Sequence, residues 1–244
     1  MRKTFIIMNR ELASYFATPL AYVFIVIFLF LAGVFTFYFG LFIERDHADL
    51  RSFFEFHPWL YLFLMPAISM RLWAEERKSG TIEFLMSLPV PFGATVLGKF
   101  LAAWAFTAIA LSLTFPMWLT VNYLGNPDNG VILAGYVGSL VMAGGYLAIS
   151  SCISAITKNQ IIAFVTGVVV CFIFTIAGQG LVTDFFGAFA PQWVVNLIAS
   201  FSFSTHFDAI IEGVIDVRDI IYFLTLIAFF LYANAVVIEF KKAS

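Results

Sequence analysis

The sequence predicts an all-α, polytopic membrane protein with six transmembrane helices. Of its 244 residues, 62% are hydrophobic and 11% are charged, whereas soluble globular domains carry about 25% charged residues. The mean hydropathy is +0.97. Because a helix needs about 20 mostly apolar residues to cross a bilayer, this length leaves room for roughly six spans and for no soluble catalytic domain.

Breaks in the apolar pattern give the order of the elements. An amphipathic stretch before Pro19 is too charged to cross a bilayer and is expected to lie at the membrane surface. Pro66 lies inside the second apolar run and predicts a kinked or broken helix there. The predicted elements are an interfacial helix at 4–17, spans at 19–43, 57–73, 95–122, 131–156, 161–181 and 219–239, a charged region in water at 74–91, and short re-entrant or interfacial helices at 183–217.

The positions of lysine and arginine predict the orientation. Of the thirteen basic residues, only Arg45, Arg51 and Arg218 fall on the membrane side opposite the charged region. Cytoplasmic loops carry the excess of basic residues. Both termini of this multi-pass protein are therefore expected in the cytoplasm.

The charged region contains a predicted helix end and a second, short helix. Gly80 is a natural C-terminal stop for the helix that leaves the membrane, and Thr81 can cap the next one. Each large apolar side chain on that short helix would contribute roughly 1.5 to 3 kcal/mol if it were buried. The helix is therefore expected either to dock into a groove of a partner protein or to rest on lipid headgroups. These apolar side chains are Ile82, Phe84, Leu85 and Met86.

The segment from Gly93 to Phe100 comes close to a phosphate-binding P-loop without matching it. Phe100 stands where the motif requires a serine or threonine hydroxyl for magnesium, and the segment opens an apolar span instead of following a strand. Lys99 is expected to anchor the cytoplasmic end of that span. This chain is therefore expected to bind no cofactor, and if ATP drives it, the ATP and magnesium would belong to another subunit.

The sequence predicts no metal site, no disulfide framework, no nucleic-acid surface and no ion coupling. His47, His57 and His206 match no spacing of metal ligands and are expected to be solvated or interfacial. Cys152 and Cys171 lie in apolar spans and indicate no disulfide framework. The net charge of -2 offers no basic surface for nucleic acid. No span carries a charged residue in its interior, which counts against an ion-coupled carrier.

Two features of the spans concern contacts within the membrane. A face of small residues on the fourth span, from Ala143 to Ala155, permits close helix packing, either inside the subunit or against a second membrane subunit. Phenylalanines crowd the outer half of the first span, which allows an apolar lateral cleft for a lipid-like or protein substrate.

Several motifs resemble the permease subunits of ABC-2 type (type V) transporters. The charged region reads Glu75-Glu76-x-x-x-Gly80-Thr81-Ile82-Glu83-x-Leu85, and Leu88-Pro89 and Gly98-Lys99 follow it. A closer resemblance to the gliding-motility-associated, GldF-like branch rests on Phe53-Phe54, Pro58-Trp59, Phe63-Leu64-Met65-Pro66-Ala67, Met70-Arg71, Leu124-Gly125-Asn126-Pro127 and Asn159-Gln160-Ile161.

The resemblance implies that the chain performs no chemistry and works with other subunits in the bacterial inner membrane. A dimer of cytosolic ABC ATPases would drive it through a coupling region at 74–91. A second permease is implied, either a heteromeric partner with a large periplasmic domain or a second copy of this chain. The residues implied to dock into the ATPase are Glu75, Glu76, Gly80, Thr81, Ile82, Glu83, Phe84 and Leu85.

Two functions stay open at this point. The chain is either a transporter permease, or a non-transporting scaffold that uses the same ATPase to act on periplasmic or cell-surface machinery. An ATPase stimulated by a substrate would favour the transporter, and one that responds only to a periplasmic protein would favour the scaffold.

Overall fold

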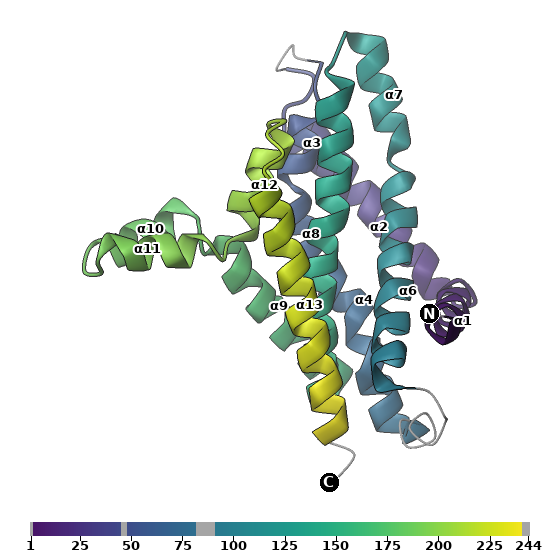
Figure 1. Ribbon diagram of the computed structural model, residues 1–244. Coiled ribbons are helices and arrows are strands. Elements are labelled where there is room, and N and C mark those ends of the chain that lie inside the picture. Colours follow the sequence, from purple (N-terminus) through teal and green to yellow (C-terminus); the bar gives the residue numbers. More distant parts are fainter. Residues whose placement is uncertain (1, 45–47, 82–90, 241–244) are drawn as a thin grey trace.

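The computed structural model describes residues 2–44, 48–81 and 91–240, and these form a bundle of helices without a strand (Figure 1). The all-α class predicted from the sequence is confirmed for this part of the chain. Its helices are α1 (Arg2–Phe16), α2 (Pro19–Val34), the π-helical turn η1 (Phe35–Phe39), α3 (Arg51–Glu55), α4 (His57–Ser79), α6 (Phe92–Ser112), α7 (Phe115–Leu124), α8 (Asn129–Ile156), α9 (Gln160–Ile176), α10 (Gly180–Gly187), α11 (Gln192–Ala199), α12 (Phe203–Ile211) and α13 (Val217–Phe240).

Four stretches of the described residues are long and apolar enough to cross a membrane. They are α2 with η1, α6 with α7, α8, and α13. Two pairs of helices are bent at a short break, α9 with α10 by 72° and α11 with α12 by 68°, and counting each pair as one span gives six. The prediction of a polytopic membrane protein is confirmed, and the assignment of six particular spans stays a prediction.

The predicted second span, α4, does not belong to this group, although it is the central helix of the bundle. Five of its last nine residues are charged, beginning at Arg71. The helix packs against α8 and α9, and thirteen of its 23 residues are buried. It also continues through Pro66 as one helix, so of the two predicted outcomes a break is wrong and a kink stays a prediction. Gly167 of α9 faces Pro66 and leaves room for the proline ring.

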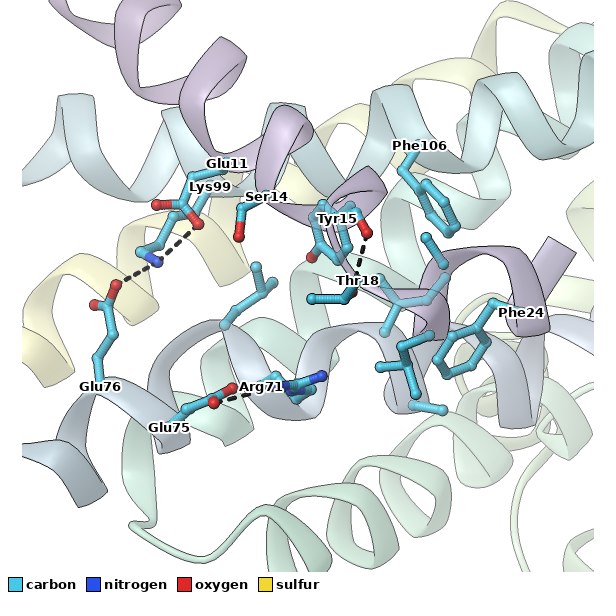
Figure 2. Close-up of a pocket in the computed structure, with 15 residues that line it drawn as sticks. Glu11, Ser14, Tyr15, Thr18, Phe24, Arg71, Glu75, Glu76, Lys99 and Phe106 are labelled. Carbon is cyan, nitrogen blue, oxygen red and sulfur yellow. Dashed lines mark hydrogen bonds and ion pairs between the residues drawn. The ribbon is translucent and has the colours of Figure 1, made fainter.

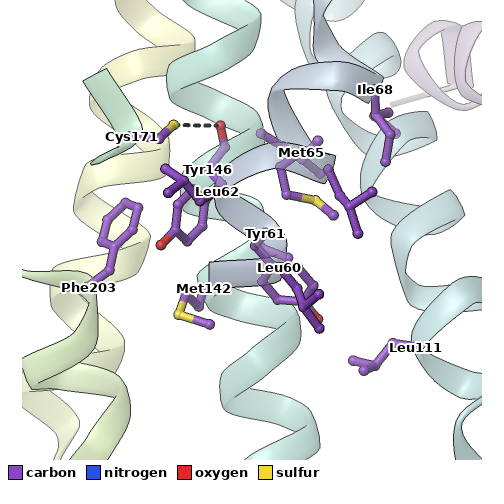
Figure 3. Packing of buried hydrophobic residues seen from close by; sticks show 14 of the residues in the cluster. Leu60, Tyr61, Leu62, Met65, Ile68, Leu111, Met142, Tyr146, Cys171 and Phe203 are labelled. Carbon is purple, nitrogen blue, oxygen red and sulfur yellow. Dashed lines mark hydrogen bonds between the residues drawn. The ribbon is translucent and has the colours of Figure 1, made fainter. Parts of the chain in front are cut away.

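The core forms where α4, α8, α9 and α12 meet (Figure 3). Buried hydroxyl groups bind across this core instead of facing lipid. Tyr61 of α4 shares a 2.7 Å hydrogen bond with Ser139 of α8, and Tyr146 of α8 shares another of 2.7 Å with Thr175 of α9. A buried hydroxyl without a partner is costly in an apolar medium. These pairs therefore fix the rotation of each helix as well as its position.

The small residues of α8 are packed inside the chain. A Cβ atom on Gly144 would lie 2.9 Å from Ile227 of α13, and one on Gly145 would lie 3.3 Å from Phe203 of α12. Ser151 accepts a 2.8 Å hydrogen bond from the amide of Asn234 on α13. Of the two alternatives for this face, packing within the subunit is therefore the observed one.

His57 differs from the expectation that the histidines are solvated or interfacial. His57 is fully buried among aromatic rings and its Nδ1 lies 2.8 Å from the Ser139 hydroxyl. His206 of α12 has its Nδ1 atom 2.6 Å from Asp219 and its ring stacked on Tyr222. Phe28 and the nearby Phe53, Phe54 and Tyr61 surround the His57 ring, whereas the His206 side chain stays 17% exposed and its interfacial position stays a prediction. The third, His47, lies outside the described residues.

The segment between the last two long helices consists of three short helices, α10 to α12. In Figure 1, α10 and α11 project sideways from the bundle and α12 returns to it. Phe203 and Phe207, both fully buried, pack α12 against the bundle. Short helices in this segment agree with the pattern of the sequence, and their place at the outer membrane surface stays a prediction.

The N-terminal helix α1 crosses α6 on the outside of the bundle (Figure 1), and Gly98 makes this crossing possible. A Cβ atom on Gly98 would lie 2.8 Å from Ile7 Cγ2 and 3.1 Å from the Thr4 carbonyl oxygen. The Thr4 carbonyl belongs to the backbone of α1, which cannot move aside as a flexible side chain could. A larger residue at position 98 must therefore displace α1.

We expect Gly98→Val to lower the free energy of unfolding by about 1–3 kcal/mol, the usual cost of overpacking a close contact. The measurement is the unfolding midpoint of the purified protein in detergent. Gly93→Val is the matched control, because the same substitution on the same helix meets nothing within 4 Å. Equal losses in the two variants would contradict the close α1–α6 contact.

Candidate functional site

The described part of the predicted docking region is the C-terminal end of α4. Gly80 ends the helix with a φ of 72°, the left-handed conformation that glycine adopts at little cost, so the predicted helix stop is confirmed. Thr81 lies beside it, with its hydroxyl 2.9 Å from Ser79 Oγ. Ile82, Glu83, Phe84 and Leu85 lie outside the described residues, as does Met86. We call the end of the bundle where α4 ends and α6 begins the Gly80 end.

Glu75 and Glu76 point in different directions from the last turns of α4 (Figure 2). Glu75 forms an ion pair with Arg71, at 2.9 Å between Arg71 Nε and Glu75 Oε2, and both side chains stay partly exposed. Glu76 points into the protein, where its Oε1 atom lies 2.6 Å from Lys99 Nζ. Only one of the two neighbouring carboxylates is therefore available to a partner at the surface.

Lys99 is not the surface anchor that the sequence predicts, because its residue is only 2% exposed. Its Nζ atom also lies 3.3 Å from Glu11 Oε2 on α1, and the ring of Trp73 lies 5.4 Å away. We call Glu11, Glu76 and Lys99 the Lys99 triad. An ammonium group this far from water is stable only beside opposite charge, so the triad ties α1, α4 and α6 together.

The prediction that no span interior carries a charge is corrected at this position. Lys99 lies inside the predicted third span, two turns from the start of α6, and it does not reach the surface. Position 99 alone gives no sign of this, since a lysine near the end of a span usually extends to the interface. The carboxylates that make burial possible come from two other helices.

The charges of the triad act on their neighbours in α1. Burial alone would raise the pKa of Glu11, but the charge of Lys99 and the hydrogen bond from Arg10 outweigh burial and hold it below its ordinary value. Burial, together with the charge of Glu11, raises the pKa of Tyr15. At neutral pH Glu11 is therefore ionised and Tyr15 is a neutral phenol.

A cavity of about 370 Å³ adjoins the triad between α1, α2, α4 and α6 (Figure 2). Its wall is polar near the Gly80 end and apolar farther along the helices. The polar part is lined by Glu11, Ser14, Tyr15, Thr18, Arg71, Glu75, Glu76 and Lys99, and the apolar part by Leu20, Ala21, Phe24, Ala67, Ile68, Leu72 and Phe106.

This arrangement suits binding and mechanical connection. Among the described residues, no group of three histidine, cysteine or acidic side chains could hold a metal ion. Residues 93–100 are helical throughout as part of α6, so they do not form a phosphate-binding loop. Any displacement of the end of α4 acts on Glu76, and through Lys99 it acts on α6 and α1.

We expect Lys99→Met to lower the free energy of unfolding by up to about 3 kcal/mol, because it leaves two carboxylates partly buried without their cation. This expected loss lies at the lower end of the usual range because the side chains of Glu11 and Glu76 are each still 18% exposed. The free energy of unfolding is measured in detergent. Replacing Glu11 and Glu76 by glutamine in the same chain should restore part of the loss.

Arg10→Met serves as the control for loss of a cation next to Glu11. The Arg10 side chain is 61% exposed, so its ion pair is expected to contribute less than about 1 kcal/mol. If Arg10→Met and Lys99→Met destabilised the protein equally, burial of Lys99 would not be the reason for the effect.

The pH dependence of the triad follows from the lowered pKa of Glu11. Because this pKa is lower in the folded protein than the ordinary 4.5, the stabilisation is present above that value and is lost as the pH falls through the folded value. We expect the difference in unfolding midpoint between wild type and Glu11→Gln to be constant from about pH 8 to pH 6 and to shrink below about pH 4. A difference that grows in acid would contradict an ionised, paired Glu11.

The comparisons with known proteins fit this arrangement. None of the curated proteins compared with the chain matches it. The family model described as ABC-2 family transporter protein matches residues 20–240, from the first turn of α2 to the last residue of α13. Because the match covers most of the chain and the structure is a bundle with several membrane-crossing helices, the chain belongs to the ABC-2 family of transporter proteins.

Proposed function

We propose that this chain is the permease subunit of an ABC transporter that a separate cytosolic ATPase drives from the Gly80 end. The match to the ABC-2 family over residues 20–240 is the observation that carries the proposal, since members of this family are membrane components that pair with an ABC ATPase. The polar end of α4, with its exposed Glu75, supports the placement of the partner at this end.

The proposed docking surface consists of the exposed side of the α4 end and the residues that follow. Glu75, Gly80 and Thr81 are accessible there, and the sequence predicts that Ile82, Glu83, Phe84 and Leu85 complete the surface. For Glu76 we propose a connecting role, because its carboxylate is bound to Lys99. Closure of an ATPase dimer would move the end of α4, and Glu76 would pass that movement to α6 and α1.

The orientation and the partners belong to the same proposal. The Gly80 end would face the cytoplasm of a bacterial inner membrane, in agreement with the excess of basic residues assigned to that side. A second permease would complete the membrane part, either a heteromeric partner with a large periplasmic domain or a second copy. Membership of the GldF-like branch rests on the sequence motifs alone.

Affinity purification of the tagged chain in mild detergent, followed by mass spectrometry and an ATPase assay, tests the partnership. Recovery of an ABC ATPase, with or without a second permease, is the expected result. A chain that is purified alone, even after cross-linking at residues 81–88, would count against the proposal.

We expect Glu83→Lys and Phe84→Asp to leave membrane insertion intact and to reduce the ATPase rate of the reconstituted complex to that of the isolated ATPase. The reason is the loss of a charge and of an apolar anchor from the proposed docking helix. Glu44→Lys is the matched control, because it makes the same charge reversal at an exposed site beyond η1. A wild-type ATPase rate in either docking variant would contradict the assignment of these residues to the docking surface.

The alternative function is a scaffold that transmits ATPase work to extracytoplasmic machinery without moving a substrate. The same reconstituted complex separates the two functions. Stimulation of ATP hydrolysis by a candidate substrate favours the transporter. Stimulation only by a periplasmic protein favours the scaffold.

A further inference from the structure

The two bends of the chain at α10 and α11 decide where these helices point. The helices α10 and α11 pack on each other, project sideways and make few contacts with the rest of the bundle (Figure 1). The chain bends by 72° where α9 meets α10 and by 68° where α11 meets α12. The direction of this pair of helices therefore depends on the contacts that hold the bends.

The bend between α11 and α12 is held by two neighbouring carbonyl groups. The carbonyl oxygen of Ser200 lies 2.9 Å from Nε2 of His206 on α12. The carbonyl oxygen of Phe201 accepts a 2.6 Å hydrogen bond from the hydroxyl of Tyr222 on α13. The rings of His206 and Tyr222 are stacked, with 4.1 Å between their centroids. We call His206, Asp219 and Tyr222 the His206 latch.

The hydrogen bonds of His206 require a proton on each ring nitrogen. A carbonyl oxygen only accepts, so Nε2 must donate its proton to Ser200. Nδ1 lies 2.6 Å from Oδ1 of Asp219, and an ionised carboxylate also only accepts. A neutral imidazole has a single N–H and can make only one of these bonds. The geometry therefore fits an imidazolium between a carboxylate and a carbonyl.

The surroundings of the ring favour this charged form. Asp219 lies in the first turn of α13, where the helix dipole favours a negative charge. The stacked ring of Tyr222 attracts a cation over its face. The other titratable groups on α12 and on the helices packed against it have other partners: Asp208 and Glu212 face Arg51 and Glu55 of α3, Tyr146 bonds to Thr175, and Cys171 bonds to Ser150.

From this geometry we propose that the His206 latch is a proton-dependent switch that sets the direction of α10 and α11. The protonated ring binds Ser200 and Asp219 together and holds the two helices in their sideways position. When the imidazolium loses a proton to water, one of the two acceptors loses its donor and the bend is released. The exposed apolar side chains that would then meet new surroundings are Leu181, Phe185, Phe189, Trp193 and Leu197.

Nitrogen NMR of the full chain in lipid nanodiscs, with isotopically labelled histidine, tests the protonation state. The signals of His206 are assigned by their absence in His206→Gln. We expect two protonated ring nitrogens at about pH 6 and one at about pH 9, on either side of the range in which histidine usually titrates. A ring that carries the same number of protons at both pH values would overturn the proposal.

The distance between two spin labels tests the movement in the same preparation. Leu197→Cys on α11 and Tyr232→Cys on α13 place the labels at exposed sites, whereas Cys152 and Cys171 are buried. A single distance is expected at about pH 6, and its loss in favour of a broad distribution at about pH 9. An unchanged distance in the otherwise wild-type chain would contradict the switch.

Two variants separate the proton from a purely structural role of the latch. In Asp219→Asn the new amide can donate to Nδ1 of a neutral ring while Nε2 still donates to Ser200, so the single distance should persist at about pH 9. In His206→Gln the distance distribution should no longer depend on pH. If either variant lost the single distance between the two pH values as the wild type does, His206 would not be the switch.

Discussion

A buried ammonium group joins three helices that are far apart in the sequence. Lys99 of α6 lies between Glu76 of α4 and Glu11 of α1, at 2.6 and 3.3 Å. No residue of the helix α1 is fully buried, but Leu12, Tyr15 and Phe16 pack against the core. These apolar contacts, the triad and the close contact at Gly98 together fix the position of α1, and the cavity lies between α1 and α4.

The two neighbouring glutamates of α4 illustrate how one charged stretch can serve two purposes. Glu75 stays near water and pairs with Arg71 along the helix, while Glu76 turns inward to Lys99. A helix places successive residues about 100° apart around its axis, so adjacent charges necessarily face different surroundings. In the proposed transporter, the outward carboxylate belongs to the docking surface and the inward one connects this surface to the bundle.

Local patterns made the fold class and the helix end at Gly80 predictable from the sequence. Each depends on residues within one turn of each other or on the composition of a whole segment. The Lys99 triad and the burial of His57 depend on partners from other helices, and the apolar periodicity of a span does not tell which helices become neighbours. For the same reason α4 is central in spite of its charges: its polar end projects from the bundle while its apolar part fills the core.

An excess of one negative charge lines the cavity and opposes its closure. If α1 moved onto α4, Glu11, Glu75 and Glu76 would approach one another with only Arg71 and Lys99 to neutralise them, and the third carboxylate would lose water without gaining a cation. Apolar contact between the two helices would have to exceed that cost. Tyr15 and Phe16 of α1 already contact the ring of Phe106 on α6, so this apolar contact is made while the cavity stays open.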